Sequence, residues 1–186
     1  MSHHDDAALR AHLEAYVGKP MTAGGRAIAP DPVNLPMIRH WVDAFDDQNP
    51  VYLDAAVAAT TRFGGVVAPP AMLQTWTMAR PIVQGLAERG GSAQPMGDNV
   101  LTALDAAGYT ATRATNSELE FDRYLHIGDE LSATTVLESI SEEKVTALGT
   151  GFFVTWVSTY TDQRGDPVGR QRFRVLKFKA NTSAEA

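Results

Sequence analysis

Apolar positions recur at helical spacing in the first half of this chain and alternate with polar positions in the second half. In residues 6–17, Leu9, Leu13 and Val17 lie near one helical face, and Gly18 follows as a terminator. We therefore expect an N-terminal helix that ends at Gly18. Residues 19–33 are rich in Pro and Gly and predict an irregular lead-in.

A second helix is predicted after Asn34. The Asn34 side chain suits an N-cap, and Pro36 suits the first turn, where its missing N–H would be unpaired in any case. Four apolar residues then fall at i, i+3, i+4 and i+7, namely Ile38, Trp41, Val42 and Phe45. This spacing predicts a single apolar face.

Two further helices are expected. Asp54 can cap a short helix over residues 55–62, which Gly64 and Gly65 end. Pro70 is expected to open a third, longer helix, because the next apolar residues share one face: Met72, Leu73, Trp76 and Ala79. Pro81 has no backbone donor, so this helix must end or kink there.

The second half of the chain predicts strands. Residues 85–108 are mixed, with a Gly-rich loop and then a helical turn at residues 99–106. Leu119 and Phe121 alternate with glutamates, and longer runs follow at residues 131–140, 145–161 and 168–178, with turns between them. In the longest run, Phe152, Val154 and Trp156 should line one face, and Thr155, Val157 and Thr159 the other. Gly149 and Gly151 suggest a bulge or a sharp coil within it.

Helices followed by an antiparallel meander indicate an α+β fold. The chain of 186 residues is expected to form one domain, 1–186, with a helix and lead-in at 1–25 and a loose tail at 180–186. The net charge of −6 gives no reason to expect nucleic acid as a partner. No apolar run is long enough to span a membrane, and there are no cysteines, so we expect a cytoplasmic protein without disulfides or thiolate metal sites. We expect no metal and no cofactor.

One stretch carries chemistry. Asp47, Asn49, Pro50 and Val51 match a motif that runs roughly Gly-Asp-x-Asn-Pro-apolar-His, and a Gly64-Gly65 turn and a Pro69-Pro70 pair follow it. This stretch resembles the MaoC-like hydratase/dehydratase family. The flanking segments 31–41, 68–78 and 174–179 look like the MaoC-like part of the larger, catalytically degenerate subunit of actinobacterial steroid side-chain enoyl-CoA hydratases.

The resemblance implies a hot-dog fold, in which a curved antiparallel sheet wraps a long central helix. It also implies a 2-enoyl-CoA or hydroxyacyl thioester as substrate, bound between paired subunits whose sheets become continuous. The resemblance places the base at Asp47 and the other contacts with substrate at Asn49, Tyr52, Gly65, Ala68, Ala71, Met72 and Trp76. Because prolines lack an N–H, only Ala68, Ala71 or Met72 could donate to the substrate carbonyl in that region.

The sequence departs from the family motif at two positions. Asp46 stands for the glycine, and Tyr52 stands for the histidine. A phenol with a pKa of about 10 is a poor base at neutral pH, whereas an imidazole near about 6.5 is well suited. The chain is therefore expected to need a catalytic hot-dog partner that supplies the Asp–His pair, while this subunit accommodates a bulky acyl group.

Alternative roles remain open for these residues and for the chain. Asp47 could instead cap or order its loop, Asn49 could orient the loop through side-chain-to-backbone hydrogen bonds, and Tyr52 could donate to substrate or only pack. Trp76 could belong to the core. The chain could also be a self-sufficient homodimeric hydratase that uses Asp47, or a non-catalytic acyl-CoA-binding scaffold.

Overall fold

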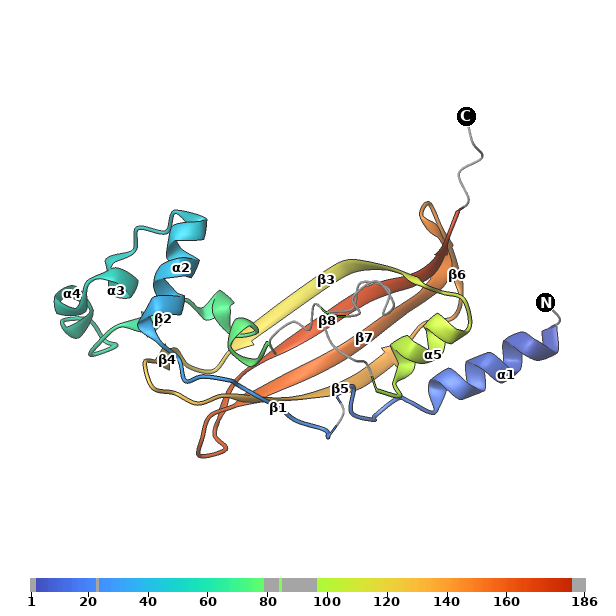
Figure 1. Cartoon of the computed structure of the whole chain (residues 1–186), viewed down its shortest axis with the longest axis horizontal. Coiled ribbons are helices and arrows are strands. Elements are labelled where there is room, and N and C mark those ends of the chain that lie inside the picture. The colour runs from blue at the N-terminus through green and yellow to red at the C-terminus, as the bar shows by residue number, and fades with distance from the viewer. Residues whose placement is uncertain (1–2, 23, 79–83, 85–96, 182–186) are drawn as a thin grey trace.

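A curled antiparallel sheet forms the body of the protein in the computed structural model, which describes residues 3–22, 24–78, 84 and 97–181 (Figure 1). The strand order is β1-β5-β7-β8-β3, and β6 pairs beside β7. The strands of this sheet are β1 Ala27–Ile28, β3 Ala111–Phe121, β5 Ser132–Ile140, β6 Lys144–Thr146, β7 Gly149–Thr161 and β8 Pro167–Ala180. The strands predicted at residues 131–140 and 168–178 are therefore confirmed.

The run predicted as one strand at 145–161 is a hairpin, because the chain turns at Ala147 and Leu148 between β6 and β7. The predicted bulge at the glycines is also wrong. Gly149 and Gly151 pair in unbroken register with β8, and a Cβ on Gly151 would lie 2.1 Å from the backbone oxygen of Lys177. These glycines are explained by a close approach of two backbones.

Phe152, Val154 and Trp156 lie on one face of β7, in an apolar cluster under the helices. On the other face Thr159 is exposed and Val157 is half-buried, but Thr155 is only 1% exposed, so this face is not uniformly open to solvent. Helix α1 (His3–Glu14) and helix α5 (Val100–Ala106) cover this cluster through Leu13 and Leu104. Figure 1 shows both helices at one end of the sheet.

A lobe of short helices lies at the opposite end of the sheet (Figure 1). It contains α2 (Leu35–Phe45), α3 (Pro50–Leu53) and α4 (Ala55–Ala59). The Asn34 side chain accepts from the Met37 N–H at 3.0 Å, which confirms the predicted N-cap of α2.

The apolar face of α2 is narrower than its spacing predicted. Ile38 and Val42 are buried in a second apolar cluster, but Phe45 is 66% exposed and stacks on Trp41 with ring centroids 4.7 Å apart. The prediction that Phe45 shares the buried face is wrong. The helix has Asp46 as its C-cap, and Phe45 in its last turn lies largely in solvent.

The segment after Pro70 corrects a further prediction. Instead of a continuous α-helix, the described residues form two 3₁₀ turns, η1 (Pro70–Met72) and η2 (Thr75–Thr77). In η1 the Met72 N–H donates to the Pro69 carbonyl and the Leu73 N–H donates to the Pro70 carbonyl, which is the i→i+3 pattern of a 3₁₀ turn. Ala79 and Pro81, on which the longer helix was predicted, lie outside the described residues, as does most of the loop predicted from residue 85.

Candidate functional site

The loop that carries the acidic motif begins with a left-handed residue. Asp46 ends α2 with φ 50°, and it is the one non-glycine residue with a positive φ in the described part of the chain. Glycine adopts this conformation without strain, and Asp is among the few other residues that tolerate it. The MaoC-like motif therefore has a glycine at this position because the backbone is left-handed there, and Asp46 adopts the same conformation at some cost in backbone strain.

The next two motif residues form hydrogen bonds within the loop. The Asp47 carboxylate accepts the Asn49 N–H at 3.0 Å, and the Asn49 side chain accepts the Val51 N–H at 3.2 Å. Asn49 thus caps α3, in which Pro50 takes the first helical position. Asp47 is half-buried and Asn49 is exposed. Both side chains do the loop-ordering work that the sequence left open as an alternative to catalysis.

Tyr52 points into the protein. It is 7% exposed and lies in the apolar cluster with Ala68, Met72 and Trp76. Burial raises the pKa of the Tyr52 phenol, and the nearby Tyr124 and Asp47 raise it further. A higher pKa keeps the phenol protonated at neutral pH, so Tyr52 is a poorer proton acceptor than free tyrosine.

Tyr124 is a site residue that sequence reasoning missed. Its ring stacks on Phe63 with centroids 4.5 Å apart, and its interaction with Tyr52 places it beside the motif. Tyr124 precedes β4 (Leu125–His126), which pairs with β2 (Val67–Ala68). The alternation of Tyr124 and His126 around buried Leu125 is a strand signal that could have found it.

Three predicted contact residues lie around this two-stranded pair. Ala68 is 1% exposed in β2, and Ala71 is exposed on η1. Gly65 is half-buried, and no atom lies within 4 Å of the position that a Cβ would take there. Gly65 therefore lines open space, whereas Ala68 faces packed side chains.

The candidate N–H donors differ in availability. The Met72 N–H donates to the Pro69 carbonyl at 3.0 Å and is consumed by the 3₁₀ turn. The Ala71 N–H has no hydrogen-bond partner among the described residues. Of the two candidates in η1, Ala71 is the one that remains able to polarise a carbonyl.

Trp76 completes the cluster from η2. The ring is 5% exposed, and its indole Nε1 is buried with no hydrogen-bond partner in the part of the chain that the structure describes. The predicted residues Tyr52, Ala68, Met72 and Trp76 are thus brought together, with Asp47 beside them. Asn49, Gly65 and Ala71 lie toward the outside of the same region.

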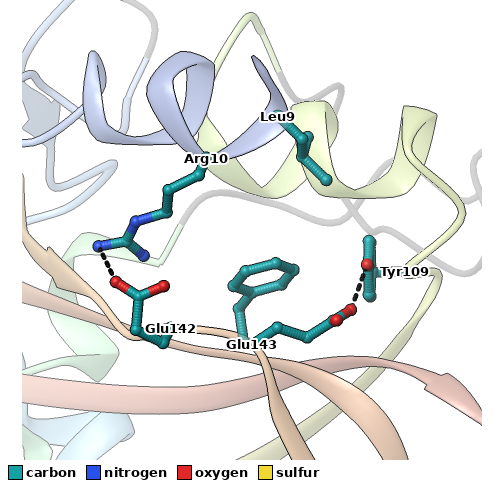
Figure 2. A pocket seen from close by; sticks show the side chains of 6 residues that line it. Leu9, Arg10, Tyr109, Glu142 and Glu143 are labelled. Atoms are coloured by element: carbon teal, nitrogen blue, oxygen red, sulfur yellow. Dashed lines mark hydrogen bonds and ion pairs between the residues drawn. The ribbon is translucent and has the colours of Figure 1, made fainter. Parts of the chain in front are cut away.

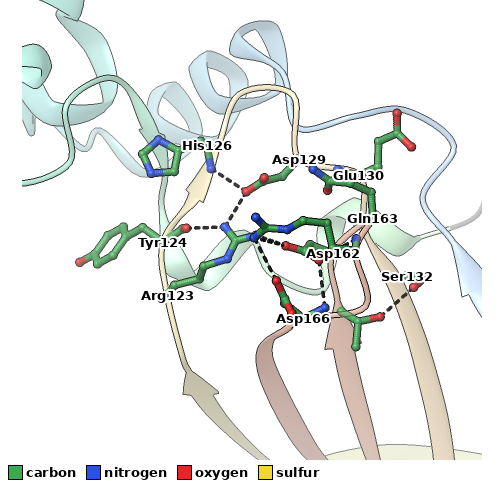
Figure 3. Close-up of polar contacts among 11 residues, drawn as sticks. Arg123, Tyr124, His126, Asp129, Glu130, Ser132, Asp162, Gln163 and Asp166 are labelled. Carbon is green, nitrogen blue, oxygen red and sulfur yellow. Dashed lines mark hydrogen bonds and ion pairs between the residues drawn. The ribbon is translucent and has the colours of Figure 1, made fainter.

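An ion-pair network holds β4 against the end of the main sheet (Figure 3). Arg123 donates to Asp129 at 2.7 Å and to Asp162 at 2.9 Å, and the same Asp129 oxygen accepts the His126 N–H. Burial alone would raise the pKa of Asp162, but N–H groups of the β7–β8 turn and the Arg123 guanidinium lower it to about 2. This network fixes β4, and through β4 it fixes the strand that leads to Pro69 and Pro70.

A surface pocket of about 100 Å³ lies elsewhere, between α1 and the sheet (Figure 2). It is lined by Leu9, Arg10, Tyr109, Glu142, Glu143 and Phe152. Arg10 pairs with Glu14 at 2.8 Å and with Glu142 at 3.4 Å, so its charge is already engaged. None of the predicted site residues lines this pocket, which lies at the end of the sheet remote from Tyr52.

The described residues contain no group of three or more His, Cys, Asp or Glu side chains that could hold a metal ion. They also contain no helix long and apolar enough to cross a membrane.

Comparison with known proteins agrees with this architecture. A model of the FAS1-like, dehydratase domain region matches residues 25–171, which is most of the chain. The chain belongs to the FAS1-like dehydratase family. The resemblance to MaoC-like proteins is confirmed, and with it the hot-dog fold class predicted from the motif.

Two curated relatives of this FAS1-like dehydratase chain are named as alpha subunits. A probable enoyl-CoA hydratase alpha subunit from Thermomonospora curvata is 49% identical over 170 residues, covering 90% of this chain and 51% of that protein. The 3-oxo-4,17-pregnadiene-20-carboxyl-CoA hydratase alpha subunit from Mycobacterium tuberculosis is 41% identical over 153 residues, covering 82% and 47%. The chain thus spans about half the length of these relatives.

A solved structure matches nearly the whole FAS1-like dehydratase chain. A chain in the crystal structure of the ChsH1-ChsH2 complex from Mycobacterium tuberculosis superposes with a TM-score of 0.77 at 34% identity. The match covers 98% of this chain and 96% of that one. The predicted similarity to a subunit of a steroid acyl-CoA hydratase is therefore confirmed at the level of sequence by the pregnadiene carboxyl-CoA hydratase alpha subunit, and the ChsH1-ChsH2 complex shares the fold.

Proposed function

We propose that this chain is a subunit of a heteromeric 2-enoyl-CoA hydratase. It shapes the site for a bulky, steroid-type acyl group, and a partner hot-dog subunit supplies the Asp–His pair. The observation that carries this proposal is the buried Tyr52, whose raised pKa leaves no proton acceptor at the position of the family histidine.

The reaction explains why Tyr52 matters. Adding water across an enoyl thioester requires a base that takes a proton from water, a donor that protonates C2, and N–H groups that stabilise the enolate oxygen. A protonated phenol can donate but cannot take the first proton at neutral pH. Asp47 is also engaged in its loop through the Asn49 N–H, so it is poorly placed to act without a partner base. No cofactor is needed in this scheme, because the CoA thioester is the substrate.

The proposed contribution of this chain is binding. Tyr52, Ala68, Met72 and Trp76 form a largely apolar wall, and the unpaired Ala71 N–H borders it. Such a wall, with few polar groups, suits a large apolar ligand. The names of both alpha-subunit relatives support a CoA thioester, and the name of one supports a steroid acyl group. We place this reaction in the cytoplasm.

The sheet offers a surface for the partner. Strand β3 pairs with β8 along one edge, and no other described strand pairs with its second edge. Nine of its eleven residues are exposed. An unpaired edge of this length can accept a strand from another chain, and MaoC-like subunits are expected to pair sheet to sheet.

The test is an assay of this chain alone and with a hot-dog partner that carries the Asp–His pair. Using 3-oxo-4,17-pregnadiene-20-carboxyl-CoA, we expect turnover only when both chains are present. Asp47→Asn in this chain should reduce turnover by less than ten-fold, whereas the same change in the partner's Asp should abolish it. Robust hydration by this chain alone, lost in Asp47→Asn, would overturn the proposal. Binding measured by calorimetry without turnover, even with the partner, would favour a non-catalytic acyl-CoA-binding module.

A further inference from the structure

The indole N–H of Trp76 is a buried donor without an acceptor. The side chain is 5% exposed, and the Nε1 atom itself is shielded from solvent. More than nine in ten buried polar groups in folded proteins have a hydrogen-bond partner, and leaving one unpaired costs about 1–3 kcal/mol. Trp76 Nε1 is the one buried side-chain nitrogen or oxygen without a partner in the described part of the chain, so its exception requires a specific cause.

The surroundings hold Trp76 in a fixed position. Two residues earlier, Gln74 accepts a hydrogen bond from the Gln171 side-chain amide of β8 at 3.2 Å. The same amide donates to Ser117 of β3 at 3.1 Å, and Tyr160 of β7 donates to the Gln171 oxygen at 3.4 Å. Gln171 of β8 therefore fastens the segment that carries Trp76, and Ser117 of β3 and Tyr160 of β7 in turn hold Gln171. A donor held in this way loses little conformational entropy when it binds.

The walls around the donor are apolar. Tyr52, Met72 and Leu73 share its cluster, and Gln171 already has bonds to both Gln74 and Ser117. An isolated N–H in such a wall selects one oxygen acceptor on an otherwise hydrophobic ligand. Burying an anion among apolar side chains is costly, so a neutral ketone or hydroxyl oxygen is the acceptor favoured here. Met72 is fully buried in the same cluster, and its flexible thioether can move to admit a ligand.

We propose that Trp76 Nε1 donates a hydrogen bond to a ketone or hydroxyl oxygen on the bulky acyl group, so that this subunit selects oxygenated acyl-CoA esters. The inference rests on the proposed function and adds the chemical group that is recognised. A substrate without that oxygen would leave the donor unpaired inside the site, which is the arrangement that discriminates most strongly against an analogue.

The ligand probes are 3-oxo-4,17-pregnadiene-20-carboxyl-CoA and its 3-deoxo counterpart, with the partner subunit present. The wild-type enzyme should show a kcat/KM at least about ten-fold higher for the oxo ester, since a hydrogen bond of ordinary strength corresponds to a factor of that size. Trp76→Phe keeps an aromatic ring and removes the N–H, so it should reduce this ratio to near one. Trp41→Phe, on half-buried Trp41 of α2, is the matched control and should leave the ratio unchanged.

A second measurement does not depend on the variant folding. The chain has three tryptophans, so ¹⁵N-indole labelling gives three N–H signals, and the single Phe variants that fold assign them. The Trp76 signal should shift on adding the oxo ester and stay in place with the deoxo ester. A Trp76 signal that ignores both esters and exchanges with a trapped water would overturn the inference. So would equal turnover of both esters, which leaves the proposed function standing, whereas turnover of neither ester would contradict the proposed function itself.

Discussion

Gly151 offers a sharp test of how the sheet is packed. Its backbone angles are ordinary, but a Cβ added there would lie 2.1 Å from the Lys177 oxygen and 2.6 Å from the Cα of Phe178. Gly151→Ala therefore forces β7 away from β8 by about 1 Å, since a Cβ tolerates contacts no closer than about 3 Å. The neighbouring strand β6 pairs with the other edge of Gly151, so β7 cannot shift freely in that direction.

The expected cost follows from three contributions. Overpacking costs about 1–3 kcal/mol, and loosening two ladder hydrogen bonds adds about 1 kcal/mol each. Replacing Gly by Ala returns about 0.4–1 kcal/mol by restricting the unfolded chain. The net destabilisation should be about 2–5 kcal/mol. Gly65→Ala is the matched control, because no atom lies within 4 Å of its Cβ position, and it should stabilise by about 0.4–1 kcal/mol.

Urea unfolding followed by circular dichroism measures both changes. The Gly151→Ala midpoint should fall with an unchanged m-value, and the Gly65→Ala midpoint should rise slightly. If the two variants unfold within about 0.5 kcal/mol of each other, the close approach of β7 and β8 is not a real constraint.

Three further predictions concern the ion-pair network and the helical lobe. Arg123→Gln should lower the free energy of unfolding by about 2 kcal/mol, because it removes the link between β4 and the β7–β8 turn. Arg164→Gln, at a 69% exposed position, should cost less than half as much, and thermal unfolding of both variants measures the difference. Because the pKa of Asp162 is lower in the folded state than in the unfolded chain, its carboxylate stabilises the fold above the unfolded-state pKa. In acid unfolding, this stabilisation should persist down to about pH 4 and disappear between about pH 4 and 2. Asp162→Asn should remove this part of the pH dependence of stability. Phe45→Ser should change stability by less than about 0.5 kcal/mol, whereas Ile38→Ala should cost about 2–5 kcal/mol in urea unfolding.

Local chemistry made much of the fold predictable. Asn34 and Asp54 each cap the helix that their side chains predicted, because the bond from an Asn or Asp oxygen to an N–H spans only two or three residues. The face of β7 that carries Phe152, Val154 and Trp156 also followed the alternation, but the burial of Thr155 on the other face did not. Gly151 shows where this reasoning ends. A glycine required by a neighbouring backbone looks the same in sequence as a glycine required by a bulge.

The site was predictable in its members more than in their contacts. The motif located Asp47, Asn49 and Tyr52, and the structure brings Tyr52 together with residues of the next segment. The motif could not indicate Tyr124, which lies just before β4, more than 70 residues later in the sequence. Nor could periodicity show that the residues after Pro70 form 3₁₀ turns, since apolar spacing is similar in both helix types over so short a segment.

The β3 edge, with which no other described strand pairs, has a practical consequence for the production of this chain. The eleven residues of β3 have an edge that pairs with no other described strand, so they can pair with any other extended polypeptide, including a second copy of this chain. Expression without the partner subunit should therefore give a concentration-dependent precipitate, whereas co-expression of both chains from one mRNA should keep this chain in solution. The yield of soluble protein would then depend more on how soon the β3 edge is paired than on the stability of the core.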